Sequence, residues 1–471
     1  MTDRFAVLWT RAGGTPTKMG SLVATTRECR FSYDAGFVHA GLPGFSLLAP
    51  VEQLLDKSPV VRAATERFPL HPRLMALIPP NSPGNLQRRV YAELLSKKKP
   101  PPAPGFETEW GILMLAGRNG IGHLDVFPSD LEAEDWYTQQ AGETAVIGGR
   151  SGIWGLLRDE VRQSGSIGAD SAQVLADVMG PTPSVGGMTT KLLAAIPDLP
   201  VWGGAMARPG TRAVHQTPYT DAVIKIEQPG YEGITVLEEL CYTVHEAMGF
   251  RVPRRWTLEI EGLRILAVER FDRTRAGLPI PYESLLTTFS SGSPSVTSTS
   301  DLLLPEVAAW IKKLARLCAI DVKTTLREIF SRIAVALMTG NGDLHLDNLG
   351  FLGGSRDVVL APVFDPAPMR AWPRHNMRLA TPIDFVHDEP MYRQIAKAGT
   401  AFGFTLSEAL DVLYRVGDAT QDYRKLVTAS KGVPSAQKKQ LRDIVAAERR
   451  LLDETIMSTR KPPAAPRTSS G

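Results

Sequence analysis

The stretch Asn341-Gly342-Asp343-Leu344-His345-Leu346-Asp347-Asn348 follows an apolar segment of helical character that ends near Met338-Thr339-Gly340. A glycine just beyond the last apolar residue is typical of a helix end, and Asn-Gly favours a turn. We therefore expect these eight residues to form a loop that gathers two carboxylates, two amides and an imidazole. Such a turn is commonplace on its own, so its meaning depends on the residues that accompany it.

Asp343 and Asn348 are five positions apart, the separation between the Asp and the Asn of the catalytic loop of protein kinases. In that chemistry a carboxylate accepts the proton of the attacking hydroxyl, and an amide oxygen helps to hold Mg²⁺ on the phosphates. The pattern predicts Asp343 as a catalytic base and Asn348 as a metal ligand. Because Mg²⁺ prefers oxygen ligands, we expect His345 beside the cofactor in a supporting or structural role.

A second carboxylate is needed to bridge the metal, and Asp365 is the candidate. It follows an apolar strand candidate at residues 358–364, where kinases place the Asp of an Asp-Phe-Gly motif. The order here is Phe364-Asp365-Pro366, so the Asp is matched and the Phe-Gly after it is not.

A candidate phosphate-contacting lysine ends the apolar stretch Val223-Ile224-Lys225. A lysine at a strand end is usually only solvated. However, the helix predicted next begins with Glu238 and Glu239, where an ion-pair partner for the lysine is expected. Glu238 is preferred, although the sequence does not separate the two.

A candidate phosphate-covering loop precedes this strand. It comprises Ser184-Val185-Gly186-Gly187-Met188-Thr189-Thr190-Lys191, whose glycines allow close backbone approach and whose threonines and lysine offer polar contacts. A Gly-Gly loop is a weak signal by itself. No G-x-x-x-x-G-K-[ST] sequence is present, which disfavours a P-loop nucleoside triphosphatase.

The composition is that of an ordinary globular protein, with 43% hydrophobic and 22% charged residues among 471. With 53 basic and 50 acidic residues the net charge is +3, which does not suggest a dedicated DNA-binding protein. Cys29, Cys241 and Cys318 lie far apart, which favours a reducing compartment over a disulfide framework. No leader and no apolar run of about 20 residues is visible, so we expect a cytoplasmic protein with no membrane contact.

The predicted elements run from strands to helices. Strand candidates lie at residues 5–9, 20–24, 29–33, 222–226 and 256–268, the last a hairpin that turns at Glu261-Gly262. A helix is predicted over residues 238–248 and a flexible Ser/Thr-rich loop over residues 290–300. Beyond about residue 305 the sequence is mainly helical, apart from a hairpin-like piece at residues 351–360. This order predicts an α+β fold of two lobes with a cleft between them.

With these residues in place, the chain resembles the HipA family of toxin kinases from bacterial toxin–antitoxin systems. The most specific segment, Ala267-Val268-Glu269-Arg270-Phe271-Asp272-Arg273, is similar to the family's A-V-E-R-F-D-R hinge. The serine-bearing loop, the lysine strand, the catalytic loop and the metal-binding Asp follow in the family's order. Residues 78–83 and 117–119 resemble its N-terminal subdomain, so the resemblance covers most of residues 1–455.

The resemblance implies a bilobal protein-kinase-like fold of the HipA type, with a β-rich N-terminal subdomain and a mainly helical C-terminal lobe. We expect four parts: a HipA-type N-terminal subdomain, an ATP-binding lobe with the phosphate loop and hinge, a helical lobe with the catalytic and metal-binding loops, and a disordered tail. Their predicted limits are residues 1–125, 126–275, 276–458 and 459–471.

The resemblance also implies roles for residues, with ATP and Mg²⁺ as cofactors. Lys225 contacts phosphate with Lys191 closing over it, and Glu269 and Phe271 offer backbone groups to adenine. Ser184 corresponds to the serine that family members autophosphorylate. A phosphate there adds about −1.5 to −2 charge to the loop that cradles ATP, so we expect it to expel the loop and switch the kinase off.

The implied partners are a helix-turn-helix antitoxin, through which alone DNA is contacted, and a protein substrate in translation, such as an aminoacyl-tRNA synthetase. Asp347 departs from the family, whose members commonly carry Lys just before the loop Asn. Losing that cation near the phosphates lowers the rate or changes the substrate. Two alternatives stay open: a small-molecule kinase, against which the hinge segment argues, and an inactive kinase-like partner of a DNA-bound antitoxin, which Asp347 favours.

Overall fold

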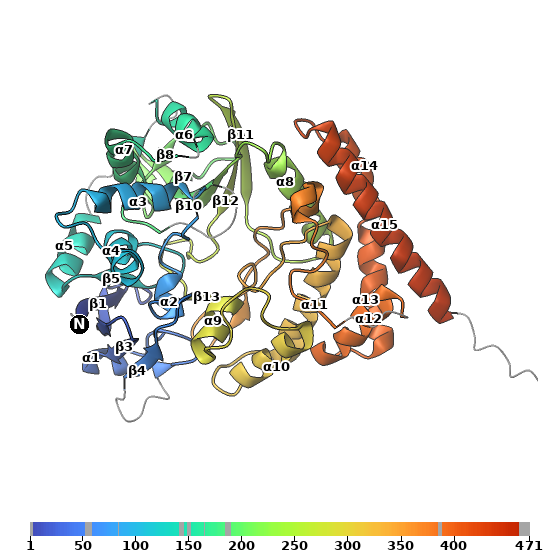
Figure 1. Cartoon of the computed structure of the whole chain (residues 1–471), viewed down its shortest axis with the longest axis horizontal. Helices are drawn as coiled ribbons and strands as arrows, with labels where there is room; N and C mark the ends of the chain where they lie inside the picture. The colour runs from blue at the N-terminus through green and yellow to red at the C-terminus, as the bar shows by residue number, and fades with distance from the viewer. Residues whose placement is uncertain are drawn as a thin grey trace, which may run out of the picture.

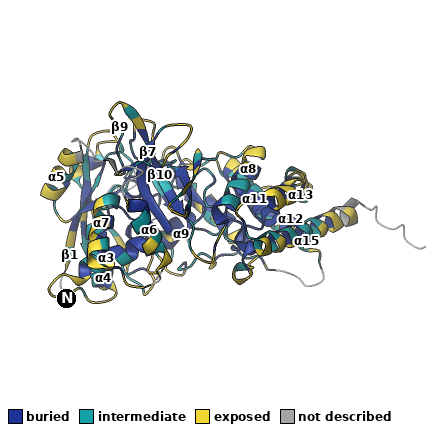
Figure 2. Cartoon of the chain, turned by 90° about the horizontal axis from the view of Figure 1, so that it is seen from above, coloured by how far each residue is buried: buried dark blue, intermediate teal, exposed yellow. Residues whose placement is uncertain are grey.

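The computed structural model describes residues 3–51, 59–82, 84–140, 146–147, 152–163, 165–183, 190–384 and 389–460. Figure 1 shows two sheets and helices α1 to α7 on one side of the molecule, and helices α10 to α15 on the other. The described residues form three large hydrophobic cores, one under each of these sheets and one within the helical half. Figure 2 shows that burial is concentrated inside each of these parts.

The N-terminal sheet is antiparallel, in the order β4-β3-β2-β1-β5, so the late strand β5 pairs with β1. Alternation along β1 points Ala6 and Leu8 into a core that includes Trp110 and Leu113 of α4. The strands of this sheet are β1 (Arg4–Thr10), β2 (Thr17–Ala24), β3 (Glu28–Tyr33), β4 (Val60–Ala63) and β5 (Asp125–Phe127). The helices of this part are α1 (Ala35–Val38), α2 (Pro72–Met75), α3 (Leu86–Ser96), α4 (Phe106–Ala116) and α5 (Asp130–Gln140).

The second sheet has the order β11-β12-β10-β7-β8-β6, with β9 paired to β10 beside this path. One face packs on α3, α6 and α7, while Leu266 and Val268 on the other face pack on Tyr242 of α8. Its strands are β6 (Val146–Ile147), β7 (Thr190–Pro197), β8 (Met206–Ala207), β9 (Ala213–Val214), β10 (Thr217–Ile226), β11 (Arg255–Ile260) and β12 (Leu263–Glu269). Its helices are α6 (Ile153–Arg162), α7 (Ala169–Met179) and α8 (Ile234–Ala247).

The C-terminal half is built around α11 (Val322–Thr339), which is buried at every position from Ile333 to its end. A helix that is apolar on all sides is the centre of its core. The surrounding helices are α9 (Leu285–Gly292), α10 (Leu304–Leu314), α12 (Met391–Ala398), α13 (Leu406–Ala419), α14 (Tyr423–Ala429) and α15 (Ser435–Arg460), with 3-10 turns η2 (Met369–Ala371), η3 (Pro373–His375) and η4 (Gly399–Phe402). A small sheet of β13 (Tyr282–Ser284), β14 (Gly350–Leu352) and β15 (Val359–Leu360) faces the N-terminal half.

The succession of a β-rich part and a helical part confirms the predicted α+β class, and the hairpins at residues 256–268 and 351–360 are also confirmed. The loop predicted over residues 290–300 is wrong at its start, because α9 continues to Gly292. The Ser291 hydroxyl donates to the Thr287 carbonyl, four residues earlier, at 2.7 Å, and so is accommodated in the helix. The strand predicted over residues 358–364 is reduced to two residues.

The limits predicted for the four parts stay predictions, and most of the predicted tail lies outside the described residues. Among the described residues, no helix is both long and apolar enough to cross a bilayer.

A buried ion cluster joins the second sheet to the N-terminal part. Asp272 accepts hydrogen bonds from Arg270 Nη2 at 2.8 Å, Arg273 Nη1 at 2.7 Å and the Gly122 N–H at 2.7 Å. Both arginines also donate to the Gly120 carbonyl, at 2.5 and 2.9 Å. Burial raises the pKa of Asp272, but the two arginines more than offset this and lower it to about 2. Arg270, Asp272 and Arg273 therefore fasten the hinge segment to the N-terminal part.

Replacing Asp272 with alanine leaves two buried arginines without this carboxylate. We expect Asp272→Ala to lower the free energy of unfolding by about 3–5 kcal/mol, measured in urea. Asp453→Ala is the matched control, because Asp453 is 62% exposed and lies 4.0 Å from Arg449, a pair expected to contribute about 0–1 kcal/mol. Equal losses for the two variants would contradict the structural role of the cluster.

Candidate active site

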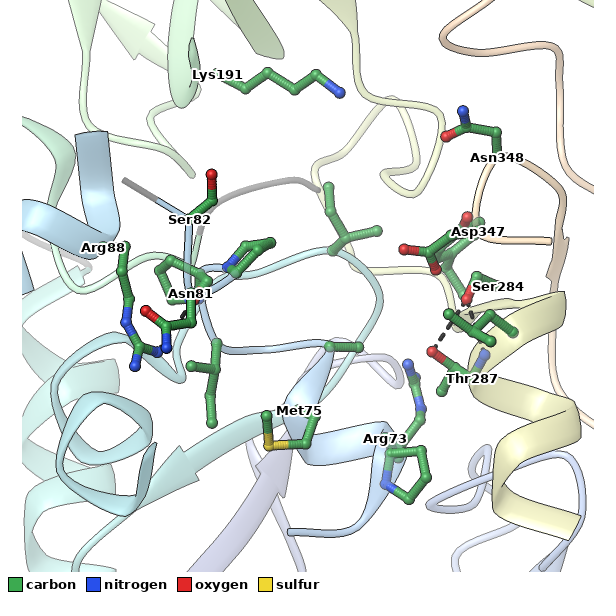
Figure 3. A pocket seen from close by; sticks show the side chains of 18 of the residues that line it. Arg73, Met75, Asn81, Ser82, Arg88, Lys191, Ser284, Thr287, Asp347 and Asn348 are labelled. Carbon is green, nitrogen blue, oxygen red and sulfur yellow. Dashed lines mark hydrogen bonds between the residues drawn. The ribbon is translucent and has the colours of Figure 1, made fainter. Parts of the chain in front are cut away.

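One cavity of about 880 Å³ lies between the second sheet, the helical half and the N-terminal part. Seven of the residues predicted for the site line it: Lys191, Lys225, Glu269, Phe271, His345, Asn348 and Asp365. Figure 3 shows Lys191 and Asn348 at one end, and Arg73, Met75, Asn81, Ser82 and Arg88 of the N-terminal part on the opposite wall. The sequence predicts no place in the site for this second wall: residues 78–83 resemble the family's N-terminal subdomain, but nothing in that stretch indicates that Asn81 and Ser82 line the cavity. Ser184, Val185, Gly186 and Gly187 lie outside the described residues, so their predicted roles stay predictions.

Two lysines enter the cavity from neighbouring strands. Lys225 on β10 is directly opposite Lys191 on β7 in the antiparallel register, so both side chains project from the same face of the sheet. Each is 4% exposed. Two like charges at opposed positions repel one another, and they need shared anions to remain buried.

Asp365 supplies that anion, because its Oδ1 bonds to Lys225 and its Oδ2 to Lys191. Lys225 also bonds to Glu238 of α8, the partner preferred from the sequence, while Glu239 pairs with Arg255 at the surface. The buried group is thus two cations and two anions. Burial raises the pKa of Asp365 and lowers that of Lys225, but in each case the opposite charges prevail, so the Asp365 pKa is depressed and the Lys225 pKa is raised.

The backbone at Asp365 is in the left-handed region, with a φ of 52°. A non-glycine residue in this conformation is uncommon, and it persists where the surroundings over-determine it. Here the two lysine contacts on separate carboxylate oxygens are such a constraint.

The predicted catalytic loop begins where α11 ends, at Gly340 with a φ of 74°. Inside the loop, Asn341 Oδ1 accepts from the Asp343 N–H at 2.9 Å, and Asn348 Nδ2 donates to the Asp343 carbonyl at 2.8 Å. The second bond uses the amide nitrogen of Asn348, which leaves its amide oxygen for another partner. His345 Nδ1 accepts a hydrogen bond from the Asp347 N–H at 3.2 Å, and the role predicted for His345 beside the cofactor stays a prediction.

Asp343 does not line the cavity itself, but its main-chain carbonyl accepts from Asn348, which does. The Oδ1 atom of Asp343 lies 3.6 Å from His345 Nε2. Burial raises the Asp343 pKa, an effect that His345 opposes and Asp365 reinforces. Tyr231 and His375 are near enough to interact with the Asp343 charge, and a 2.7 Å hydrogen bond joins Tyr231 Oη to His375 Nε2. No short-range signal in the sequence marks these two residues.

The hinge segment also lines the cavity, three strand positions from Lys225, because Ala222 and not Lys225 is the β10 partner of Glu269. The Glu269 N–H donates to the Arg254 carbonyl at 2.9 Å, so that donor is already used, and its carboxylate pairs with the Arg254 side chain at 2.7 Å. Within the described part of the chain, the Phe271 N–H has no hydrogen-bond partner, which suits a donor to a base. The Phe271 ring packs with Tyr282 and Phe364, at centroid distances of 5.7 and 5.5 Å.

The comparisons with known proteins agree with this architecture. The family profile of the HipA-like C-terminal domain matches residues 183–424, more than half of the chain. HipA of Shewanella oneidensis MR-1, solved with HipB and its operator DNA, is similar with a TM-score of 0.63 and 15% identity, over 95% of this chain and 97% of that one. The Helicobacter pylori proinflammatory kinase CtkA matches with a TM-score of 0.35 and 12% identity, over 51% of this chain and 92% of that one. A search of curated protein sequences finds no match.

Fold and site together define a protein with a kinase-like α+β architecture, in which a sheet-borne pair of lysines faces a loop of acids and amides from a helical lobe. The chain belongs to the HipA family. The family resemblance inferred from the sequence is thereby confirmed.

The buried ion pair with Lys225 distinguishes Glu238 from the adjacent Glu239. We expect Glu238→Ala to destabilise the protein by about 3–5 kcal/mol, because Lys225 loses one of its two buried anions. Glu239→Ala removes a half-exposed surface contact and is expected to cost about 1 kcal/mol or less. Urea unfolding of both variants checks this, and a larger loss for Glu239→Ala would show that the wrong glutamate has been paired.

Proposed function

We propose that this protein is an ATP- and Mg²⁺-dependent protein kinase that phosphorylates serine or threonine. The observation that carries the proposal is that Lys191, Lys225 and Asp365 meet in the cavity that Asn348 also lines, with Asp343 bonded to Asn348. Cations for phosphate, oxygen ligands for a metal and a carboxylate base are the parts that phosphoryl transfer requires.

The residues present fit a magnesium ion. Mg²⁺ is usually held by one or two protein oxygens together with substrate phosphates and water. Asn348 and Asp365 offer such oxygens, and the described residues contain no cluster of three or more His, Cys, Asp or Glu that would form a metal cage by itself. A bound Mg²⁺ would neutralise phosphate charge. The two lysines would then exchange Asp365 for phosphate oxygens, which frees the carboxylate for the metal.

The proton-transfer step follows from Asp343. A substrate hydroxyl attacks the γ-phosphorus, its proton passes to the Asp343 carboxylate, and the bond to the β-phosphate oxygen breaks to release ADP. Asp343 must be ionised to accept this proton, and its raised pKa makes it a better base than an exposed aspartate. The N–H of Phe271 is assigned to adenine, together with the Glu269 backbone carbonyl.

Partners are proposed from the family. The similar HipA was solved with HipB and operator DNA. We therefore propose that this chain is the toxin of a toxin–antitoxin pair, that its partner is a helix-turn-helix antitoxin, and that DNA is reached through that partner. A protein of translation is the proposed substrate, Ser184 the proposed autophosphorylation site and the cytoplasm the proposed compartment. Cys29, Cys241 and Cys318 are buried and form no disulfide with one another, which supports a reducing compartment.

The central test removes the base. We expect Asp343→Asn to lower the rate of phosphoryl transfer to substrate protein by at least about 100-fold, because general-base catalysis typically contributes that much or more. ATP binding should persist, since Asp343 is outside the cavity lining. Radiolabel transfer and calorimetric ATP binding are measured on the same samples. Undiminished transfer by Asp343→Asn would contradict the assignment, and Asp411→Asn, an exposed residue of α13, is the matched control.

The pH dependence has a definite sign. Because Asp343 has a raised pKa and acts only when ionised, kcat/KM should fall as the pH falls through that raised value, above the ordinary aspartate value of 3.8. His345 lowers the Asp343 pKa, so His345→Gln should move the acid limb to higher pH. The profile is measured over the range in which the folded protein is stable. If His345→Gln leaves the acid limb of the kcat/KM profile unmoved, or shifts it to lower pH, Asp343 is not the titrating base.

A further inference from the structure

One carboxylate on the cavity wall is not used by the chemistry above. Asp347 is half-buried and lines the cavity. Its backbone N–H bonds to His345, but no side chain or N–H of the described residues donates to its carboxylate. An ionised carboxylate is an acceptor with about four lone-pair sites, so this one has its full capacity left for a ligand in the cavity.

The position of Asp347 is fixed by backbone hydrogen bonds on both sides of it. The Leu286 N–H donates to the Leu346 carbonyl at 3.1 Å, and the Leu285 N–H donates to the Leu349 carbonyl at 2.8 Å. These bonds hold the loop against the first turn of α9. Figure 3 shows the result: the Asp347 side chain lies beside Ser284 and Thr287.

Ser284 and Thr287 add hydroxyl groups to the same wall. Ser284 Oγ donates to Thr287 Oγ1 at 3.0 Å and accepts from the Thr287 N–H at 3.0 Å. The hydroxyl hydrogen of Thr287 is then left without an acceptor among the described residues. This wall therefore presents a charged acceptor and a hydroxyl donor close together.

The wall lies between the two ends of the proposed nucleotide site. Tyr282 and Ser284 are two positions apart on β13 and so share a face. The Tyr282 ring packs against the rings of Phe271 in the hinge segment and Phe364, the neighbour of Asp365, with centroid distances of 5.7 and 6.1 Å. A nucleotide with its base at the hinge and its phosphates at the lysines therefore carries its sugar past this wall.

We infer that Asp347, Ser284 and Thr287 form a subsite for the vicinal diol of a ribonucleotide. Asp347 accepts hydrogen bonds from the two ribose hydroxyls, and Thr287 donates to a sugar oxygen. Two adjacent hydroxyl donors match one carboxylate, and the charge strengthens both bonds. The inference rests on the proposed nucleotide site, and it makes Asp347 a determinant of nucleotide specificity.

The test compares nucleotides that differ only at the sugar. The full chain carrying Asp343→Ala, which blocks turnover, is titrated calorimetrically with ATP, 2′-deoxy-ATP and 3′-deoxy-ATP in the presence of Mg²⁺. We expect ATP to bind about tenfold more tightly than either deoxynucleotide, the effect of one hydrogen bond to a charged group. Adding Asp347→Ala should weaken ATP binding about tenfold or more and bring the three affinities together.

Controls separate the outcomes. Asp411→Ala, on the exposed face of α13, should keep the preference for ATP. Thr287→Val and Asp347→Asn should reduce the preference in part, and they carry the test if Asp347→Ala fails to fold. An unchanged preference in the Asp347 variants overturns the subsite. Equal weakening of ATP and both deoxynucleotides, with the preference intact, also overturns it and assigns Asp347 to the metal or the phosphates. If the Asp343→Ala protein is folded and binds no ATP, both the proposed function and the subsite are overturned.

Discussion

The site depends on one shared carboxylate. Asp365 lies between Lys191 and Lys225 and gives each of them one oxygen, while Glu238 balances the remaining charge. Without this arrangement, two lysines at opposed positions of adjacent strands would not stay buried. The same contacts connect the sheet, which carries the lysines, to the segment after β15, which carries Asp365, and to α8, which carries Glu238. The same ion pairs therefore neutralise the buried charges and hold the walls of the cavity together.

Much of this site was predictable from local order in the sequence. Spacing alone predicts Asp343 and Asn348, the apolar residues before it predict Asp365, and a strand followed by a helix predicts the contact of Lys225 with Glu238, which the structure contains. Each of these signals is short-range. The Ser/Thr-rich composition of residues 290–300 predicts a loop, yet α9 extends to Gly292. A hydroxyl such as that of Ser291 can bond to a carbonyl of its own helix, so this composition does not exclude a helix.

The remaining features depend on contacts that no local pattern records. Tyr231 and His375 meet near Asp343 although 144 positions separate them. Asp347 acquires its neighbours because α9 bonds to the loop carbonyls, and its carboxylate stays without a described partner only as a result of that packing. The hinge segment is a further case. Its sequence matches the family's hinge, yet Arg270, Asp272 and Arg273 also hold the N-terminal part through hydrogen bonds with Gly120 and Gly122.

That last feature has a mechanical consequence. In a protein of two lobes, the segment between them is ordinarily the axis about which the lobes move. Here the axis is anchored, since Arg270 and Arg273 are tied to Asn119 and Gly120 and share Asp272 with Gly122. Any opening of the cavity must then move the N-terminal part together with the second sheet, or break the hydrogen bonds of Arg270 and Arg273 at a large cost in free energy. Relative motion of the two halves is therefore expected to displace the helical half, while the second sheet and the N-terminal part stay together.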